Sequence, residues 1–399
     1  MSFYNAKAEK PASPSIVLDD MVLTKDLPTT AGSKMLAGYM SLFDAEVVTK
    51  LRAAGYSIAG KAAVGEFAFD LMGESAADGA CVRDGKLVSA AHEIVLSGDV
   101  EAAVVLDVNG SVRRASAQSG LVSIKPTYGT VSRFGMIPVA CSGECVSVVA
   151  KTVDKCAEIL AVIAGHDAKD GTSLSAEQCQ QAQKSASNAP RKVCVIEELV
   201  QGVDEDVQKK IDLACESFKK AGATVEKISA PVFSAARSAW NILFSAELCN
   251  NVSRYDGVKY GYRAENFSGI DELYTNSRTE AFGALLKTAI IYGSETLSTE
   301  NYMKVYDKAL RTRRVIVEKF VEIFEEYDLV LLPAASKTAY TEEEVKETPD
   351  LCYVENLYTA PASISGLPSL VANGVALIAP ALADGKLLSY AKIMEGGAN

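Results

Sequence analysis

The stretch from Ala102 to Gly129 constrains the fold more than any other part of the chain. It reads AAVVLDVNGSVRRASAQSGLVSIKPTYG. The apolar run at its start is typical of a buried strand, and it leads directly into the polar turn 107–111. Consecutive backbone N–H groups around Gly110, with the hydroxyl of Ser111 at the end of the turn, can hold an anion or an oxyanion. A nucleophilic serine placed where a strand ends has this local pattern.

The segments on either side of this stretch alternate between strand and helix patterns. Residues 15–23 are largely apolar, residues 44–55 carry an apolar helical face, and residues 56–61 form a second strand pattern. The same order recurs over residues 192–228. Strand, helix and strand in this order favour parallel pairs in an α/β fold. One large domain and two fused units are both compatible with the length.

Composition limits the classes of function. The chain has 399 residues, 48% of them hydrophobic, so it can bury a large core. A net charge of −11 argues against direct binding of nucleic acid by this chain alone. The nine cysteines show no CxxC spacing and are typical of reduced thiols in a cytoplasm. No apolar stretch reaches membrane-spanning length and no secretory signal is recognised, so we expect a cytoplasmic protein with no membrane contact.

Only two histidines, His92 and His166, are available for chemistry. Triads of the Ser-His-Asp type and Cys-His pairs need a positioned imidazole, and histidine-rich metal sites need several. We expect His166 to be structural, and we expect neither a metal nor another cofactor.

Two motifs resemble a known family. Asp107–Arg113 and Lys125–Gly129 are similar to the D-T-G-G-S-I-R and K-P-T-Y-G elements of the amidase signature family. Residues 245–262, SAELCNNVSRYDGVKYGY, resemble the A-subunit branch of that family, whose members release ammonia from glutamine in tRNA-dependent amidotransferases. The resemblance runs from about residue 16 to about residue 371.

The resemblance implies a fold and a domain arrangement. The expected fold class is α/β, with the amidase-signature fold: a central mixed twisted sheet with helices on both faces. We expect residues 1–15 to be an extended lead-in and residues 16–399 to form a single amidase-signature-like domain. This domain is shorter at both ends than the family pattern.

The family uses a Ser–cis-Ser–Lys triad, and two of its three positions differ in this chain. Ser111 matches the nucleophile. The lysine position is Asp19, and a gap-free alignment to Ser111 places Leu87 at the middle serine. Ser89 is two positions away and would need a shift of register to substitute. A carboxylate cannot present an amine, and a leucine cannot relay a proton, so the resemblance predicts a broken relay.

The expected substrate contacts differ as well. In the oxyanion turn Val108, Asn109 and Gly110, asparagine replaces a glycine and adds a side chain that narrows the approach. The resemblance places Thr288 and Asn356 where family members of the A-subunit branch hold the charged ends of glutamine with an arginine and an aspartate. Neither residue carries the required charge, so weak binding of a zwitterionic amino acid is expected.

Three hypotheses follow. The leading one is a catalytically inactive A-subunit-like protein with a scaffold, partner-binding or ligand-binding role, for which proteins similar to the B and C amidotransferase subunits are possible partners. The second is an active glutaminase or amidase that uses Ser111 with rewired base chemistry, for example with Asp19 as the base. The third is a module that binds a small ligand in the old pocket.

Overall fold

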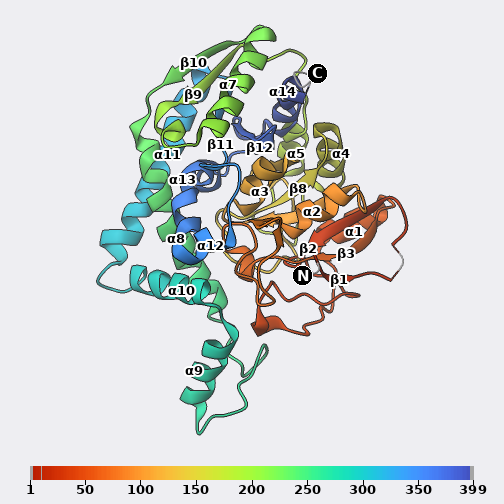
Figure 1. The fold of residues 1–399 in the computed structure, drawn as a ribbon, viewed down its shortest axis with the longest axis vertical. Coiled ribbons are helices and arrows are strands. Elements are labelled where there is room, and N and C mark those ends of the chain that lie inside the picture. The colour runs from red at the N-terminus through yellow and green to blue at the C-terminus, as the bar shows by residue number, and fades with distance from the viewer. Residues whose placement is uncertain (1–2, 10, 396–399) are drawn as a thin grey trace.

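A mixed sheet of eleven strands runs through the computed structural model, which describes residues 3–9 and 11–395 (Figure 1). The strands are β1 (Tyr4–Lys7), β2 (Ser15–Asp19), β3 (Ser57–Ala62), β6 (Ala102–Asp107), β7 (Val122–Lys125), β8 (Cys145–Ala150), β9 (Lys192–Ile196), β10 (Thr224–Ile228), β11 (Leu329–Pro333), β12 (Ser369–Ala372) and β13 (Val375–Ile378). Their spatial order is β1-β3-β2-β6-β8-β7-β12-β13-β11-β9-β10. A separate small hairpin is formed by β4 (Val82–Arg83) and β5 (Lys86–Leu87).

Helices surround this sheet. They are α1 (Glu46–Ala53), α2 (Ala90–Ser97), α3 (Ser111–Ser119), α4 (Val153–Ile163), α5 (Ala176–Ala182), α6 (Glu197–Val200), α7 (Glu205–Lys220), α8 (Ala236–Val252), α9 (Ile270–Ala281), α10 (Ala284–Thr296), α11 (Asp307–Glu326), α12 (Glu342–Glu347), α13 (Leu351–Ser365) and α14 (Asp384–Glu395). Four shorter helical turns are η1 (Lys34–Leu36), η2 (Glu66–Ala68), η3 (Pro231–Ala235) and η4 (Tyr302–Tyr306).

The apolar residues of β6 explain why both faces of the sheet are covered. Successive side chains of a strand point to opposite faces. Ala103 and Val105 pack in a core cluster with residues of α2, whereas Val104 and Leu106 belong to the cluster that contains residues of α1 and α4. Every residue of β6 is buried. The predicted fold class, an α/β fold with a central mixed sheet and helices on both faces, is confirmed.

The two strand–helix–strand predictions are also confirmed. β2 pairs with β3 in parallel, and β9 pairs with β10 in parallel. The predicted lead-in contains a strand, because β1 pairs antiparallel with β3 and extends one edge of the sheet.

The acidic segment at residues 341–350 contains a short helix. Thr341 and Glu344 form a reciprocal capping box, and α12 begins directly after Thr341. The capping pair satisfies backbone donors that acidic composition alone does not reveal.

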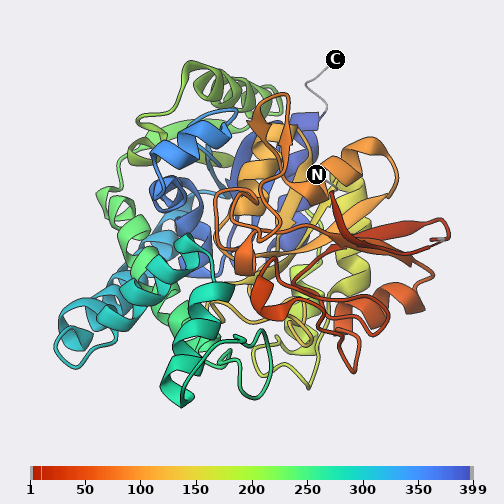
Figure 2. The same ribbon diagram turned by 60° about the horizontal axis from the view of Figure 1, so that its bottom comes forward.

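The C-terminal half adds a group of packed helices beside the sheet. α8 contacts α10, α11 and α13, and α9 lies farthest from the sheet, at the lower end of the molecule in Figure 1. The view in Figure 2 shows the same helices forming one side of the molecule. Among the described residues, no helix has the length and apolar content needed to cross a membrane.

Candidate active site

Ser111 is the first residue of α3 and follows the turn that leaves β6. The turn depends on Gly110, whose φ is +80° and whose position leaves no room for a Cβ atom, because that atom would lie 2.4 Å from the side chain of Thr359. Asp107 holds the turn from inside the protein: its carboxylate accepts hydrogen bonds from the backbone N–H of Gly110 (3.2 Å) and from Nε of Arg113 (2.9 Å). Burial alone would raise the pKa of Asp107, but the Arg113 guanidinium holds it below its ordinary value.

Asp19 and Ser111 line the same small cavity, as the alignment predicts, together with Asp70, Ser89 and His92. The cavity has a volume of about 30 Å³. The carboxylate of Asp19 is engaged by the backbone, because one oxygen accepts from the N–H of Leu106 (2.6 Å) and the other from the N–H of Met21 (3.1 Å). Burial raises the pKa of Asp19 to about 6.

The Ser111 hydroxyl makes no hydrogen bond to any residue of the described ranges 3–9 and 11–395. The buried lysine beside Asp20, Lys61, does not hydrogen-bond to Ser111. Lys61 donates to Thr29 Oγ1 (2.9 Å) and to the carbonyl of Val22, and burial lowers its pKa to about 8. No amine therefore stands beside Ser111 in this part of the chain.

The middle position of the triad is occupied differently from the gap-free alignment. Leu87 belongs to β5 and is buried, and its backbone bonds to the carbonyl of Tyr340 and to Gln118. Its side chain does not line the cavity that contains Ser111, whereas Ser89 does. The structure thus places Ser89, rather than Leu87, beside the nucleophile position.

The side chain of Asn109 lies in the protein interior. It is fully buried, and its carboxamide oxygen accepts from Nε1 of Trp240 (3.3 Å). The side chains of Asn109 and Asn356 are hydrogen-bonded to each other (2.8 Å). Asn356, the expected aspartate position, is therefore used inside the protein rather than held open for a ligand.

Arg114 fills the space next to these amides. Its guanidinium donates to the carbonyls of Leu71 (3.2 Å) and Asp70 (3.1 Å). It also donates to Thr359 Oγ1 (3.2 Å) and to Asn356 (3.3 Å). A fully buried arginine thus occupies the interior between α3, α13 and residues 70–71.

Thr288, the expected arginine position, lies away from this site. It is exposed on α10, and its hydroxyl donates to Ala284 of the same helix (3.0 Å). The neighbouring residue Ala289 is the one that faces the core, with no exposed surface. Neither side chain can provide the positive charge that the family pattern places here.

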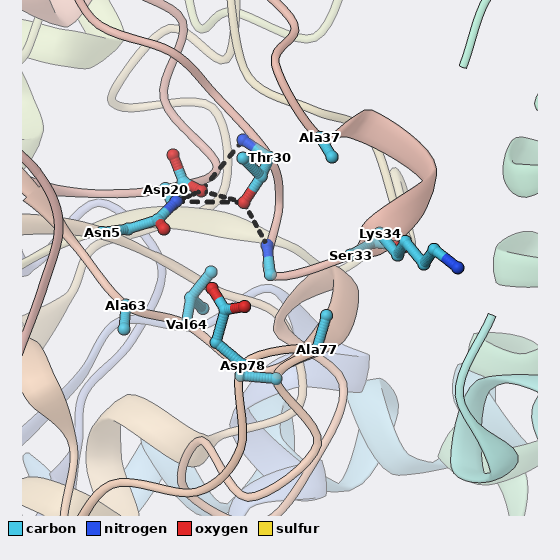
Figure 3. Close-up of a pocket in the computed structure, with 12 residues that line it drawn as sticks. Asn5, Asp20, Thr30, Ser33, Lys34, Ala37, Ala63, Val64, Ala77 and Asp78 are labelled. Carbon is cyan, nitrogen blue, oxygen red and sulfur yellow. Dashed lines mark hydrogen bonds between the residues drawn. The ribbon is translucent and has the colours of Figure 1, made fainter. Parts of the chain in front are cut away.

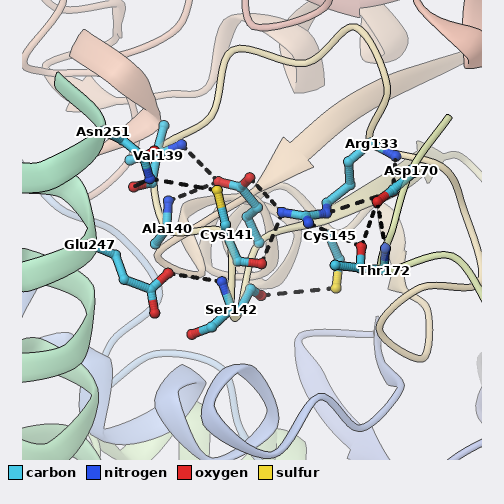
Figure 4. A network of polar contacts seen from close by, with 12 residues as sticks. Arg133, Val139, Ala140, Cys141, Ser142, Cys145, Asp170, Thr172, Glu247 and Asn251 are labelled. Carbon is cyan, nitrogen blue, oxygen red and sulfur yellow. Dashed lines mark hydrogen bonds and ion pairs between the residues drawn. The ribbon is translucent and has the colours of Figure 1, made fainter. Parts of the chain in front are cut away.

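The loop at residues 139–144 is held by Arg133 (Figure 4). Arg133 bonds to Glu144 (2.8 Å) and to the carbonyl of Cys141 (2.9 Å). Gly143 of this loop lies so close to Trp240 that an added Cβ would be 2.2 Å from the indole ring. The loop therefore packs against the tryptophan that donates to Asn109.

A second cavity, of about 210 Å³, lies next to Asp20 (Figure 3). Asp20 accepts hydrogen bonds from Asn5 Nδ2 (2.5 Å) and from Thr30 Oγ1 (2.5 Å) and N (2.9 Å). The consecutive residues Asp19 and Asp20 therefore line two different cavities. Within the described residues, no group of three or more His, Cys, Asp or Glu side chains has the arrangement of a metal site.

His92 is a site residue that the sequence patterns do not single out. Its ring lies between the hydroxyls of Ser89 (2.9 Å from Nδ1) and Ser116 (2.8 Å from Nε2). Burial lowers its pKa to about 3, so the ring is neutral. The spacing of Ser89 and His92 at the start of an apolar helix is the signal that could have revealed it. His166 is exposed, and its Nδ1 lies 2.9 Å from the carbonyl of Leu174.

Comparison with known proteins places this site in a family. The family model described as Amidase matches residues 15–82 and 94–388, most of the chain. The chain belongs to the amidase family. Residues 83–93, which carry Leu87, Ser89 and His92, lie between the two matched segments.

Relatives within the amidase family agree with the A-subunit resemblance. The A subunit of glutamyl-tRNA(Gln) amidotransferase from Streptococcus pneumoniae is 36% identical over 364 residues, covering 89% of this chain and 75% of the relative. That of Latilactobacillus sakei is 37% identical over 367 residues, with the same coverage. The crystal structure of the Thermotoga maritima protein of the same name has a TM-score of 0.81 at 26% identity, covering 98% of this chain and 86% of that one.

Proposed function

We propose that this amidase family member has lost the Ser111-centred amidase reaction and acts as an A-subunit-like scaffold that binds partner proteins. The observation that carries the proposal is the isolation of the Ser111 hydroxyl. The residue at the lysine position, Asp19, directs both carboxylate oxygens to backbone N–H groups.

The chemistry of serine nucleophiles supports this proposal. A serine hydroxyl is a weak nucleophile near neutral pH unless a neighbouring base accepts its proton. Loss of one triad member in a serine hydrolase costs on the order of 10⁴-fold in rate. Asp19 stands at the lysine position, and Ser89, which lines the cavity with Ser111, bonds to His92 rather than to Ser111.

The size of the cavity supports the proposal independently. A volume of about 30 Å³ beside Ser111 is far below the roughly 300–1,000 Å³ of ordinary ligand pockets. The small cavity and the missing amine together argue against the release of ammonia from glutamine at Ser111.

An ammonia-release assay tests the loss of activity. The purified chain and Ser111→Ala are incubated with glutamine, with the Streptococcus pneumoniae relative as a positive control. We expect equal background rates from the two forms. Turnover that disappears in Ser111→Ala would overturn the proposal.

The scaffold role is tested by partner capture. The relatives are named as subunits of an amidotransferase. In a pull-down from the source cell with this chain as bait, we therefore expect to recover proteins similar to the B and C subunits of that enzyme. Recovery of neither from cells that contain both would contradict the scaffold role.

One observation favours an active enzyme with rewired chemistry. Asp19 shares the cavity with Ser111, and its pKa is raised to about 6, which makes it a better base than an ordinary aspartate. This alternative predicts that a fluorophosphonate probe labels Ser111 and that Asp19→Asn abolishes the labelling.

A further inference from the structure

We propose that Ser89 is a reactive nucleophile, with His92 as its proton acceptor, and that the pair takes acyl groups from small uncharged esters. This activity goes beyond the proposed function, which concerns the loss of Ser111 chemistry and the binding of partner proteins. Both residues lie in the segment between the two parts of the chain that match the family model.

The geometry is that of a nucleophile, a base and a residue that orients the base. His92 Nδ1 lies 2.9 Å from Ser89 Oγ, and His92 Nε2 lies 2.8 Å from Ser116 Oγ. Hydrogen-bond contact between nucleophile and base, with a third group fixing the base, is the signature of an activated nucleophile. α2 supplies the histidine and α3 supplies Ser116.

The hydrogen bonds of the ring fit this role. Each ring nitrogen has one serine hydroxyl as its partner, and a hydroxyl can both donate and accept. In the tautomer with the proton on Nε2, the ring donates to Ser116 Oγ and Nδ1 presents its lone pair to the Ser89 hydroxyl.

The Ser89 hydroxyl does not cap the helix that follows it. It is the N-cap residue of α2, but its side chain makes no capping hydrogen bond. An N-cap serine ordinarily accepts from a first-turn N–H group, and here the hydroxyl bonds to His92 instead. The first-turn N–H groups of α2 have no partner within the helix and can donate to an oxyanion that forms near Ser89.

Ser89 and His92 also line a wider cavity on the side away from Ser111. Its volume is about 220 Å³, and its wall includes Arg83, Lys86 and Thr338. Arg83 pairs with Glu93, and the wall carries Asp84 as well as Lys86, so positive and negative side chains balance. The volume lies below the range of about 300–1,000 Å³ of ordinary ligand pockets. A short acyl group without net charge fits the small volume and the balanced charge of this cavity.

The reaction balances with these residues alone. Ser89 Oγ forms a bond to the carbonyl carbon of the ester while its proton passes to Nδ1 of His92. The bond from that carbon to the alcohol oxygen then breaks, and the proton moves from Nδ1 to the departing oxygen. The products are an acyl ester on Ser89 and a free alcohol. Water attacks the acyl carbon next, giving one proton to Nδ1, which passes it to Ser89 Oγ as the carboxylic acid leaves.

Labelling of the wild-type chain decides the proposal without any variant. The full chain is treated with a fluorophosphonate probe, and the modified residue is located by peptide mass spectrometry. We expect the label on Ser89. The absence of a label on Ser89 would overturn the proposal, whether the probe modifies Ser111 or no serine at all. A label on Ser111 would instead support the rewired amidase, and a label on Ser89 leaves the scaffold proposal untouched.

Variants and pH then test the roles of the residues. With p-nitrophenyl acetate as substrate, we expect Ser89→Ala and His92→Gln to lose at least tenfold in acylation rate, and Ser97→Ala, an exposed serine on the same helix, to retain it. The rate should stay flat between pH 5 and 8, because the pKa of His92 is about 3. We expect Ser116→Ala, which removes the partner of His92 Nε2, to lower the acylation rate, and Ser116→Thr, which keeps a hydroxyl there, to retain it. A rate that falls with a midpoint near pH 6.5 in the wild type would contradict this assignment.

Discussion

Arg114 shows at the residue scale how the site is closed. Its guanidinium is buried and donates to backbone carbonyls, a threonine hydroxyl and an amide. Replacing it by methionine leaves those acceptors unpaired in the interior, and each unpaired acceptor costs about 1–3 kcal/mol. We expect Arg114→Met to lower the free energy of unfolding by about 3 kcal/mol or more, measured by urea denaturation at one pH.

The matched control is Arg311→Met on α11. This arginine is 70% exposed and pairs with Asp307 on the same helix, so its loss should cost less than about 0.5 kcal/mol. Equal losses in the two variants would show that Arg114 does not hold the interior of the site.

Single positions are predictable where the chain around them is regular. Asp19 and Ser111 each end or follow a strand of the same sheet, and they line one cavity. Leu87 lies in the β4–β5 hairpin, whereas Ser89 lines that cavity, and counting along the chain cannot reveal this difference. Thr288 is exposed on α10 next to the buried Ala289, since one residue along a helix turns a side chain by about 100°.

At the scale of elements, Glu66 joins parts of the chain that are distant in sequence. Its carboxylate accepts from Ser33 Oγ (2.6 Å), at the start of η1, and from the N–H of Gly283 (2.8 Å), at the start of α10. Burial raises the pKa of Glu66 to about 7, so between pH 4.5 and 7 the folded state keeps a proton that the unfolded state releases. This group's contribution to stability is complete below pH 4.5 and is lost as the pH rises through 7.

Glu66→Gln isolates this effect. A glutamine keeps both contacts, since its oxygen can accept from Gly283 and its amide can donate to Ser33. We expect the wild type to lose about 2 kcal/mol of unfolding free energy from pH 5.5 to pH 8 that the variant does not lose. The difference between variant and wild type should therefore rise by about 2 kcal/mol over this interval. Urea denaturation at both pH values measures the difference, with Glu347→Gln on the exposed α12 as the control. A difference that does not change with pH would contradict the assignment.

Elements with strong periodicity are predictable from sequence, and short ones are not. The strand–helix–strand order predicted over residues 192–228 matches β9, α7 and β10, because a buried apolar strand followed by an amphipathic helix is distinctive. α12 and the β4–β5 hairpin depend on a capping pair and on two-residue ladders, which average composition does not reveal. The wall of the candidate site contains one of these short elements, so the site is harder to predict than the sheet.

At the scale of the whole molecule, Trp240 offers a direct test of cooperativity. It is the single tryptophan of the chain, it is 1% exposed, and it contacts Gly143 and Asn109 from α8. The sequence predicts one domain over residues 16–399, and for one domain all probes should unfold together. We expect the midpoints of Trp240 fluorescence and far-UV circular dichroism to coincide in urea. Separate midpoints would indicate two independently folding units.

The sheet itself explains why the whole fold is predictable from sequence. Strands such as β2 and β6 are largely apolar and buried along their full length, which requires cover on both faces. The small cavity next to Ser111 is not predictable in this way, because its wall combines residues from separate parts of the chain, such as Asp19, Asp70 and Ser89. Three-dimensional packing of large side chains has no simple periodic signature.

The interlocked amides and ring at Asn109, Asn356 and Trp240 also bear on the evolutionary history of this chain. Each of these groups holds another in place, so a substitution at position 19 or 87 leaves their contacts unchanged. Under the proposed loss of the Ser111 reaction, a lineage would need changes among these interior groups as well as at position 19 to regain it. The proposed loss would then act as a ratchet, because no single substitution restores the reaction.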